Sequence, residues 1–379
     1  MTVKRLLPIL LVLGIGTCAS LGLLAAFGAP DQASSPEQYA GWTGRVDPAT
    51  TANIAAMTPD DAVAVALLAR SARASTSLAY AGRAVSRGRA GSATTDIVHL
   101  PGRGTIVTPV APGAAAATLA PEGRSGSLAD DGTALDLLRI HYRVLREADL
   151  DATVAGRPAD AIVAVDADGV LAARYWLDHA TGLLLRKALI DPSGAARRTT
   201  EFTSFSLKVP GSVSVPATTN DPWSAPLTQQ VLAAHRAHGC ACPAALPGGL
   251  SMVDSREAPS GVFAPVPVVH QLFSDGVSAV SLFSLSGSIT TEDVQALRSK
   301  GFSSYGDGRA WLRGGTPDAM RTTLVWACRG SVLTLVTDDA ADPAATARAV
   351  LEAFPPDPPD SSFFARVARG WHRLTGGGS

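Results

Sequence analysis

The sequence lacks the motifs of the common catalytic and nucleotide-binding families. It contains no G-x-x-x-x-G-K-[ST] phosphate loop, no G-x-S-x-G nucleophile turn and no H-E-x-x-H zinc helix. Gly102 and Gly104 are not followed by the third glycine and the helix that a dinucleotide site needs. We therefore predict a binding protein rather than an enzyme, and we expect no cofactor.

Neither sign of charge is in excess. The 32 basic residues, of which only Lys4, Lys187, Lys208 and Lys300 are lysines, balance 33 acidic ones, and the formal net charge is −1. A chain this close to neutrality has no overall field that attracts a polyanion. We expect no nucleic-acid partner.

Histidine and cysteine are also few, and their placement leaves little for catalysis. His141, His179 and His270 occur singly on or beside predicted strands, and we interpret them as structural. We recognise no motif that places a nucleophile beside a general base. This again favours binding over reaction.

One cluster could carry chemistry. His235, His238, Cys240 and Cys242 fall within eight positions and could supply four ligands to zinc or copper, but their spacing matches no usual zinc pattern. The main alternative is a disulfide in an oxidising compartment, in which Cys240 or Cys242 bonds Cys328 and ties the linker to the second domain. One thiol would then be free or intermolecular.

The N-terminus has the pattern of an export signal. Lys4 and Arg5 precede an apolar run over residues 6–27, which is long enough to cross a bilayer. Segment 1–28 is either an uncleaved anchor with its N-terminus inside or a cleaved signal peptide. Both alternatives place the body outside the cytoplasm. Residues 29–56, rich in Ala, Pro, Ser and Thr, are predicted to be a linker.

Residues 57–209 are predicted to form a domain of one leading helix and many antiparallel strands. Thr58-Pro59-Asp60 has the composition of a helix start, and the helix should run to Ser77. Short strands and tight turns then alternate, with Asp166–Gly169 and Asp191–Gly194 typical of type I turns. Three strands, Tyr80–Val85, Thr94–Leu100 and Gly104–Val110, and a short helix, Thr133–Ile140, are expected before this meander.

A Pro-rich connection, residues 210–248, leads to a second domain, residues 249–356. Asp275-Gly276 between two apolar runs predicts a hairpin. Thr290 is placed to cap a helix that ends at Gly301. In the tail, residues 357–379, aromatic and basic residues alternate at helical spacing. It is either a membrane- or partner-binding amphipathic helix or a frayed end with chance periodicity.

Several runs resemble the MucB/RseB family of sigma-E regulatory proteins. The matching segments are Tyr142, Val154–Asp160, Tyr175–Asp178, Thr181–Leu183, Asp191–Gly194, Leu78–Gly82, Asp96–Leu100 and Phe273–Gly276. The resemblance implies an α+β fold: a LolA/LolB-like curved antiparallel sheet over a helix, followed by a small α+β C-terminal domain. Whether the sheet encloses an open cavity or a filled core is left open by the pattern. Arg174, Tyr175 and Trp176 could form either core or a binding face.

The same resemblance implies function. It suggests an extracytoplasmic or periplasmic regulator of an envelope-stress sigma factor, which binds a membrane anti-sigma factor and senses lipid. The alternative that it leaves open is a lipid or lipoprotein carrier without a signalling role.

Overall fold

The computed structural model describes residues 62–88, 91–110, 118–120, 132–191, 193–209, 223–237, 240–261, 264–314, 322–339 and 343–357. The expected membrane segment 6–27, the linker 29–56 and the amphipathic helix of the tail lie outside these residues. None of the helices that the structure describes combines the length and the apolar composition needed to cross a bilayer.

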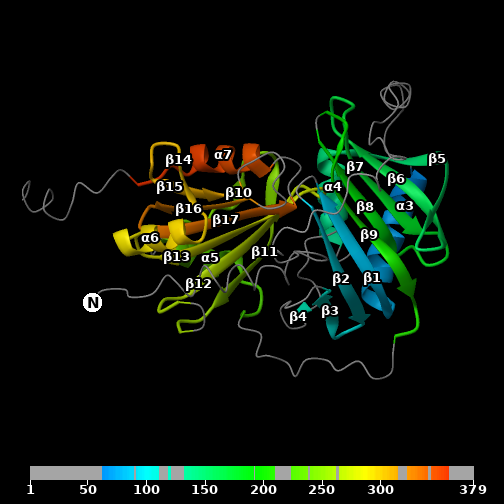
Figure 1. Ribbon diagram of the computed structural model, residues 1–379, viewed down its shortest axis with the longest axis horizontal. Coiled ribbons are helices and arrows are strands. Elements are labelled where there is room, and N and C mark those ends of the chain that lie inside the picture. The colour runs from blue at the N-terminus through cyan, green and yellow to red at the C-terminus, as the bar shows by residue number, and fades with distance from the viewer. Residues whose placement is uncertain are drawn as a thin grey trace, which may run out of the picture.

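Residues 62–209 form the first unit, built on a nine-stranded antiparallel sheet in the order β4-β3-β2-β1-β9-β8-β7-β6-β5 (Figure 1). Strands that are neighbours in sequence pair, except β4 and β5, which form the two edges of the sheet, and the β1–β9 ladder joins the two halves. Its strands are β1 (Tyr80–Gly88), β2 (Gly91–Leu100), β3 (Gly104–Pro109), β4 (Thr118–Ala120), β5 (Arg143–Val154), β6 (Arg157–Val165), β7 (Leu171–Asp178), β8 (Leu184–Ile190) and β9 (Ala196–Ser206). The predicted early strands are confirmed, and so is the leading helix from Ala62 to Ser77, whereas its predicted start at Thr58–Asp60 lies outside the described residues.

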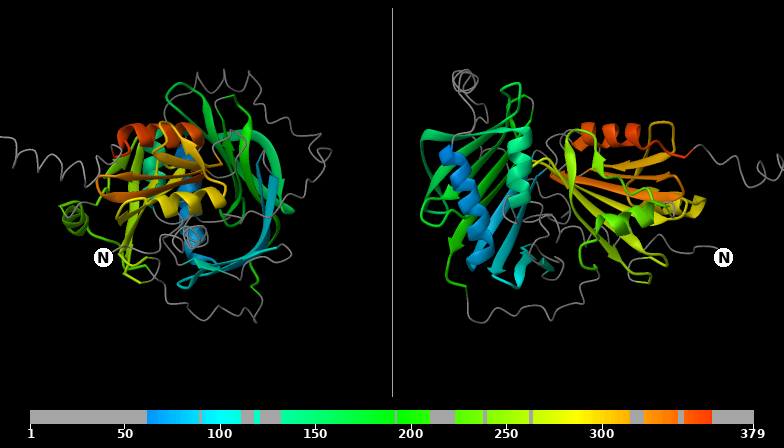
Figure 2. Two further views of the ribbon diagram at one scale, coloured as in Figure 1. Left: turned by 60° about the vertical axis from the view of Figure 1, so that its left-hand side comes forward. Right: turned by 180° about the vertical axis from the view of Figure 1, so that it is seen from behind.

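Irregular pairing bends this sheet. Register shifts interrupt the β1–β9, β5–β6, β6–β7, β7–β8 and β8–β9 ladders, and such bulges increase local twist and bending. Figure 2 shows the resulting curve, with α3 (Ala62–Ser77) and α4 (Gly132–His141) lying over one face. Leu68, Leu138, Ile162 and Tyr175 meet there in a core cluster, and each is at most 1% exposed.

Tyr175 and Trp176 are both core residues, on opposite faces of β7. Tyr175 packs under the helices, whereas Trp176 belongs to the other large cluster of the first unit. The Arg186 guanidinium lies 4.4 Å from the Trp176 ring centroid and covers it. Of the two alternatives for this segment, the structure selects the core.

Residues 240–357 form the second unit, whose sheet has eight antiparallel strands in the order β10-β11-β12-β13-β17-β16-β15-β14. They are β10 (Ala245–Leu246), β11 (Leu250–Ala258), β12 (Val268–Ser274), β13 (Ala279–Ser286), β14 (Ser303–Tyr305), β15 (Ala310–Arg313), β16 (Thr323–Cys328) and β17 (Ser331–Asp339). The preceding connection contains α5 (Gln229–Ala237).

Two helices cover opposite faces of this second sheet. Leu297 of α6 (Thr291–Ser299) packs in a cluster with Val325, whereas Val350 of α7 (Pro343–Ala353) packs in a cluster with Trp326. Because both faces are covered, all residues of β12 are buried. The predicted cap of α6 is confirmed, since Thr290 and Asp293 form a capping box.

Candidate functional site

The turn between β12 and β13 forms a compact tip held by its own polar groups. Asp275 Oδ1 accepts hydrogen bonds from the backbone amides of Val277 (2.8 Å) and Ser278 (2.6 Å). Ser274 Oγ accepts from the Gly276 amide and donates to the Ser278 carbonyl. The predicted hairpin is confirmed, and β13 begins at Ala279 because these bonds keep 275–278 in the turn.

This tip reaches out of the second unit and into the first. Val277 is 2% exposed and belongs to the same core cluster as Leu138 and Tyr175. The Lys187 ammonium on β8 donates to the Val277 carbonyl at 2.9 Å. Tyr142, which directly follows α4, donates its hydroxyl proton to Asp275 Oδ2 at 2.8 Å. We call this contact, formed by residues 274–278 with Leu138, Tyr142 and Lys187, the junction.

Close packing and charge make the junction specific. A Cβ on Gly276, whose φ is +93°, would lie 2.3 Å from the Leu138 backbone nitrogen, so only glycine fits. Burial, together with the negative charge of Asp275 and the hydrogen bond to it, raises the pKa of Tyr142 far above its ordinary value. The tyrosine therefore remains a proton donor at all physiological pH values.

A small open pocket of about 250 Å³ lies beside the junction. Its lining comes from both units: His141, Tyr142, Asp166, Ala167, Asp168, Gly248 and Asp275. Asp166 Oδ1 is already engaged by the amides of Asp168 and Val170, so this carboxylate serves the turn. In the described part of the chain, no group of His, Cys, Asp and Glu is arranged to hold a metal.

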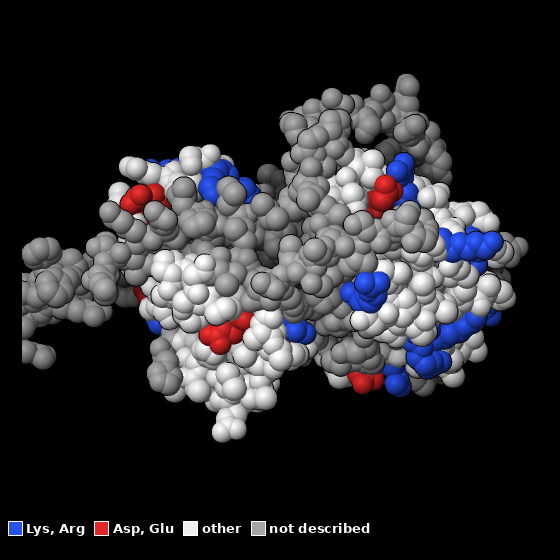
Figure 3. All heavy atoms as spheres, turned by 90° about the horizontal axis from the view of Figure 1, so that it is seen from below, with Lys and Arg blue, Asp and Glu red and all other residues white. Residues whose placement is uncertain are grey.

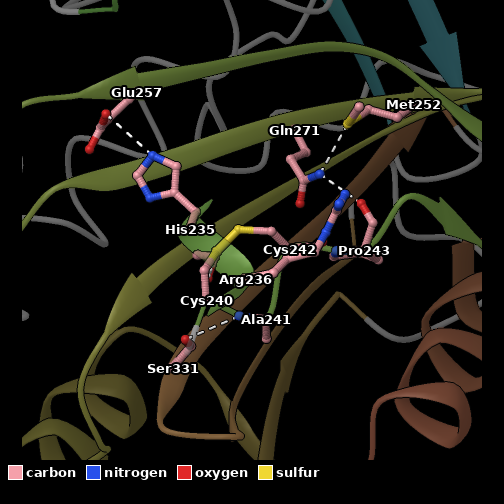
Figure 4. Close-up of a disulfide and its surroundings, with 11 residues drawn as sticks. His235, Arg236, Cys240, Ala241, Cys242, Pro243, Met252, Glu257, Gln271 and Ser331 are labelled. Atoms are coloured by element: carbon pink, nitrogen blue, oxygen red, sulfur yellow. Dashed lines mark hydrogen bonds and ion pairs between the residues drawn. A yellow bond between two sulfur atoms is a disulfide. The ribbon is translucent and has the colours of Figure 1, made fainter. Parts of the chain in front are cut away.

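The cysteines pair differently from the expectation. Cys240 and Cys242 form a disulfide with each other (Figure 4), and Cys328 is a free, buried thiol. The predicted bridge to Cys328 is therefore wrong. The reason is that Ala241 occupies the position facing β16 and β17: its amide donates to Ser331 Oγ at 3.3 Å, and Ser331 is directly opposite Cys328 in the ladder.

The alternative metal cluster of His235, His238, Cys240 and Cys242 is not assembled by the described residues. Its two thiols are consumed by the disulfide. The His235 ring faces Glu257, with Nε2 3.6 Å from a carboxylate oxygen. His238 lies outside the described residues.

The three singly placed histidines lie in different settings. His270 is buried and stacks on Phe283 with ring centroids 4.4 Å apart. His179 contacts Asp160 through Nδ1 at 2.9 Å. His141 packs against Gly249 beside the pocket.

Charged side chains on the first unit are largely engaged in pairs. Figure 3 shows Lys and Arg spread over the half of the molecule that contains the first sheet. Arg83 pairs with Asp96, and Arg87 pairs with Glu201. Dispersed pairs of this kind are typical of a solvated surface.

Sequence reasoning missed the junction. The sequence marks Tyr142 only as part of the resemblance to the MucB/RseB family, and it marks Asp275 only as a turn residue. No sequence pattern indicated that Lys187 and Val277 are in contact. The sequence around a lysine on one sheet does not show that it meets a carbonyl 90 residues away.

The first unit matches a known protein family. Residues 102–226 match the family model described as the MucB/RseB N-terminal domain. The resemblance to the MucB/RseB family is confirmed. No curated protein sequence matches the chain significantly.

Solved structures extend the MucB/RseB likeness to both units. A crystal structure of MucB aligns with a TM-score of 0.51 at 17% identity, covering 79% of this chain and 100% of that one. The predicted α+β fold class is thereby confirmed. The complex of Pseudomonas aeruginosa MucA and MucB aligns at 0.44 (20% identity, 76% and 97% covered), and MucB with MucA(peri) at 0.40 (19% identity, the same coverage).

Proposed function

We propose that this protein is an extracytoplasmic regulator that binds the exposed segment of a membrane anti-sigma factor. The supporting observation is the match of residues 102–226 to the MucB/RseB N-terminal domain within a chain whose two units share the MucB fold. MucB itself has been crystallised with MucA(peri). By binding such a segment, this protein would shield it from proteolysis and keep the envelope-stress sigma factor inactive.

The arrangement of the two units supports this role. They meet at the junction, where a short turn of the second unit is inserted into the first, and at the contact of His141 with Gly249. Units joined by a small contact are expected to move relative to one another. A partner that contacts both units would therefore be held or released according to how the junction sets their orientation. The disulfide further supports an oxidising, extracytoplasmic location.

The test is direct binding. The purified chain is titrated with the extracytoplasmic segment of a single-span anti-sigma factor encoded beside it, and binding is measured by calorimetry. Protection of that segment from a site-specific protease is measured in parallel. We expect saturable binding and protection. Absence of both with the neighbouring anti-sigma factor would contradict the proposal.

A lipid or lipoprotein carrier is the second candidate, and one observation favours it. The first sheet presents a continuous apolar face to α3 and α4, the kind of surface that could accept acyl chains. That face is closely packed, with Leu138, Ile162 and Tyr175 fully buried. A carrier of this fold would therefore have to bind an acyl chain by displacing the helices or the Val277 tip.

Mass spectrometry separates the two candidates. Detergent-free protein is extracted with organic solvent and its lipids are identified. A stoichiometric lipid without binding of any anti-sigma segment supports the carrier. Lipid that lowers the affinity for the segment supports a regulator that senses lipid.

A further inference from the structure

The Cys240–Cys242 disulfide is poorly suited to stabilising the fold. Only Ala241 separates the two half-cystines. A disulfide stabilises a protein mainly by restricting the unfolded chain, and the effect grows with the length of the loop that it closes. A ring with one intervening residue therefore gives the smallest gain.

The same segment is already held in place by hydrogen bonds. Arg236 Nε donates to the Cys242 carbonyl at 2.6 Å, and Gln271 Nε2 donates to the Pro243 carbonyl at 2.8 Å. The Ala241 amide is bonded to Ser331, as described above, and the Cys240 amide donates to the His235 carbonyl at 3.0 Å. The backbone does not need the sulfur–sulfur bond to keep its position.

The two sulfurs lie in unequal surroundings. Cys240 is partly exposed, and its Sγ lies 3.5 Å from the hydroxyl of Ser284. Cys242 is 3% exposed and lies beside the Arg236 side chain (Figure 4). An attacking thiolate can therefore reach Cys240, while Cys242 is positioned to leave.

Arg236 carries an unused donor at this place. Its Nη2 is buried and has no hydrogen-bond partner among the described residues. A buried cation with a free N–H favours a thiolate over a thiol nearby. Through the bond of its Nε to the Cys242 carbonyl, this guanidinium is a cation that adjoins the residue leaving as a thiolate.

We propose that Cys240–Cys242 is a redox-active disulfide that exchanges with a dithiol of an extracytoplasmic protein or peptide. The substrate thiolate attacks Cys240 Sγ, the bond to Cys242 breaks, and the electron pair leaves on Cys242 Sγ. The second substrate thiol, after losing its proton, then attacks the mixed disulfide and releases Cys240 as a thiolate. The substrate is oxidised by two electrons, and the pair Cys240 and Cys242 is reduced.

The experiment uses the full chain and a reduced synthetic peptide with two cysteines. After acid quenching and alkylation, mass spectrometry counts the free thiols on both molecules. We expect one peptide disulfide to form per protein, with new thiols at Cys240 and Cys242 and none elsewhere. Cys328 serves as the internal reference, because burial raises the pKa of its thiol and keeps it inert. A peptide that stays reduced until the protein unfolds would overturn the proposal.

Two single variants test the assigned roles. With the pre-oxidised peptide, Cys242→Ser should trap a mixed disulfide on Cys240, whereas Cys240→Ser should react at least about tenfold more slowly because Cys242 is buried. Equal trapping rates would overturn the assignment.

Arg236→Gln tests the leaving-group role by the rate of exchange across a range of pH. We expect exchange with the reduced peptide to be about tenfold slower than in the wild type at every pH, because Cys242 departs as a thiolate at any pH and a higher leaving-group pKa slows that step. Rates equal to those of the wild type would contradict a role for Arg236.

The double variant Cys240→Ser/Cys242→Ser separates redox function from structure. We expect its melting temperature to fall by less than about 2 °C, because the loop keeps its hydrogen bonds. A much larger fall would show a structural disulfide and overturn the proposal. Anti-sigma binding is measured on the same double variant, so failure of the redox proposal is distinguishable from failure of the proposed function.

Discussion

The hydroxyl of Tyr142 donates a 2.8 Å hydrogen bond to the carboxylate of Asp275, a residue 133 positions later in the chain. Tyr142 follows α4 in the first unit and Asp275 lies in the β12–β13 turn of the second, so this bond joins the two units. With Lys187 and Val277 it forms a junction in which one short turn carries the polar and apolar contacts alike. The relative orientation of the units therefore depends on a few side chains that can be changed individually.

Replacing Tyr142 by Phe should weaken the junction without disturbing either core. The loss of a hydrogen bond to a carboxylate that is 7% exposed should lower the free energy of unfolding by about 2 kcal/mol. Urea titration measures this change, and small-angle scattering should show a larger radius of gyration. Tyr305→Phe, on β14 of the second sheet, is the control and should leave the scattering unchanged. An unaltered radius for both variants would mean that the bond does not hold the units together.

The raised pKa of Tyr142 predicts that the stability of the fold decreases at alkaline pH. Burial and Asp275 raise the pKa of Tyr142 in the folded state above its unfolded value of about 10. Its contribution is therefore complete below pH 10 and is lost as pH rises further, by about 1.4 kcal/mol per pH unit. The stability difference between wild type and Tyr142→Phe should narrow between pH 9 and pH 11. At pH 11 we expect it to be smaller by about 1.4 kcal/mol than at pH 9. A difference that stays constant would contradict the assignment.

Gly276→Ala should separate the units more strongly. The new Cβ would lie 2.3 Å from the Leu138 nitrogen, and backbone cannot yield as a flexible side chain does. Gly194→Ala is a matched control, since Gly194 also has a positive φ of +80° but no described atom within 4 Å of its Cβ. We expect a cost of about 1 kcal/mol for the control from backbone strain and about 2 kcal/mol more for Gly276→Ala. Equal costs in thermal unfolding would refute the close approach.

Asp178→Asn should destabilise the first unit and reduce its sensitivity to acid. Arg157 donates two hydrogen bonds to this carboxylate, at 2.8 and 2.9 Å, and Thr181 donates two more. Burial alone would raise the pKa of Asp178, but these bonds outweigh burial and lower it. We expect a loss of about 2 kcal/mol at pH 7, less than for a fully buried pair because Arg157 is 29% exposed.

The acid dependence follows from the same shift. A depressed pKa contributes stability above the unfolded value of about 4, and this is lost as pH falls through the folded value. The wild type should therefore lose more stability than Asp178→Asn between pH 5 and pH 2. Asp96→Asn is the control, because Asp96 forms a similar pair with Arg83 but is 44% exposed and should change stability by less than about 0.5 kcal/mol. Similar effects for both variants would show that burial does not matter here.

Thr290→Ala tests the cap of α6. Its side chain accepts a hydrogen bond from the Asp293 amide, and Asp293 in turn accepts one from the Thr290 amide. Loss of such a cap costs about 1 kcal/mol. Ser299→Ala, at the exposed other end of the helix, should cost less than 0.5 kcal/mol. Denaturant unfolding followed in the second unit gives both values, and a larger effect at Ser299 would contradict the capping role.

Local features were predictable because their partners are close in sequence. The Asp191–Gly194 turn closes through a 2.8 Å bond from the Gly194 amide to the Asp191 carbonyl. The sequence did not predict five strands: β11 has little alternation of buried and exposed residues, and β4, β10, β14 and β15 are only two to four residues long. Their existence depends on the neighbouring strand rather than on their own pattern.

The sequence by itself determined the cap of α6, the turns and the hairpin at Asp275, because each is stabilised by atoms within a few residues. Only the tertiary structure decided that β1 pairs with β9, that Cys240 bonds Cys242 rather than Cys328, and that Tyr142 meets Asp275. The β1–β9 pairing and the Tyr142–Asp275 contact depend on the packing of surfaces more than 100 residues apart in the sequence. The disulfide depends on which side of the Ala241 segment faces the sheet. No local periodicity encodes that information, since the energy of such contacts exists only when the whole fold is assembled.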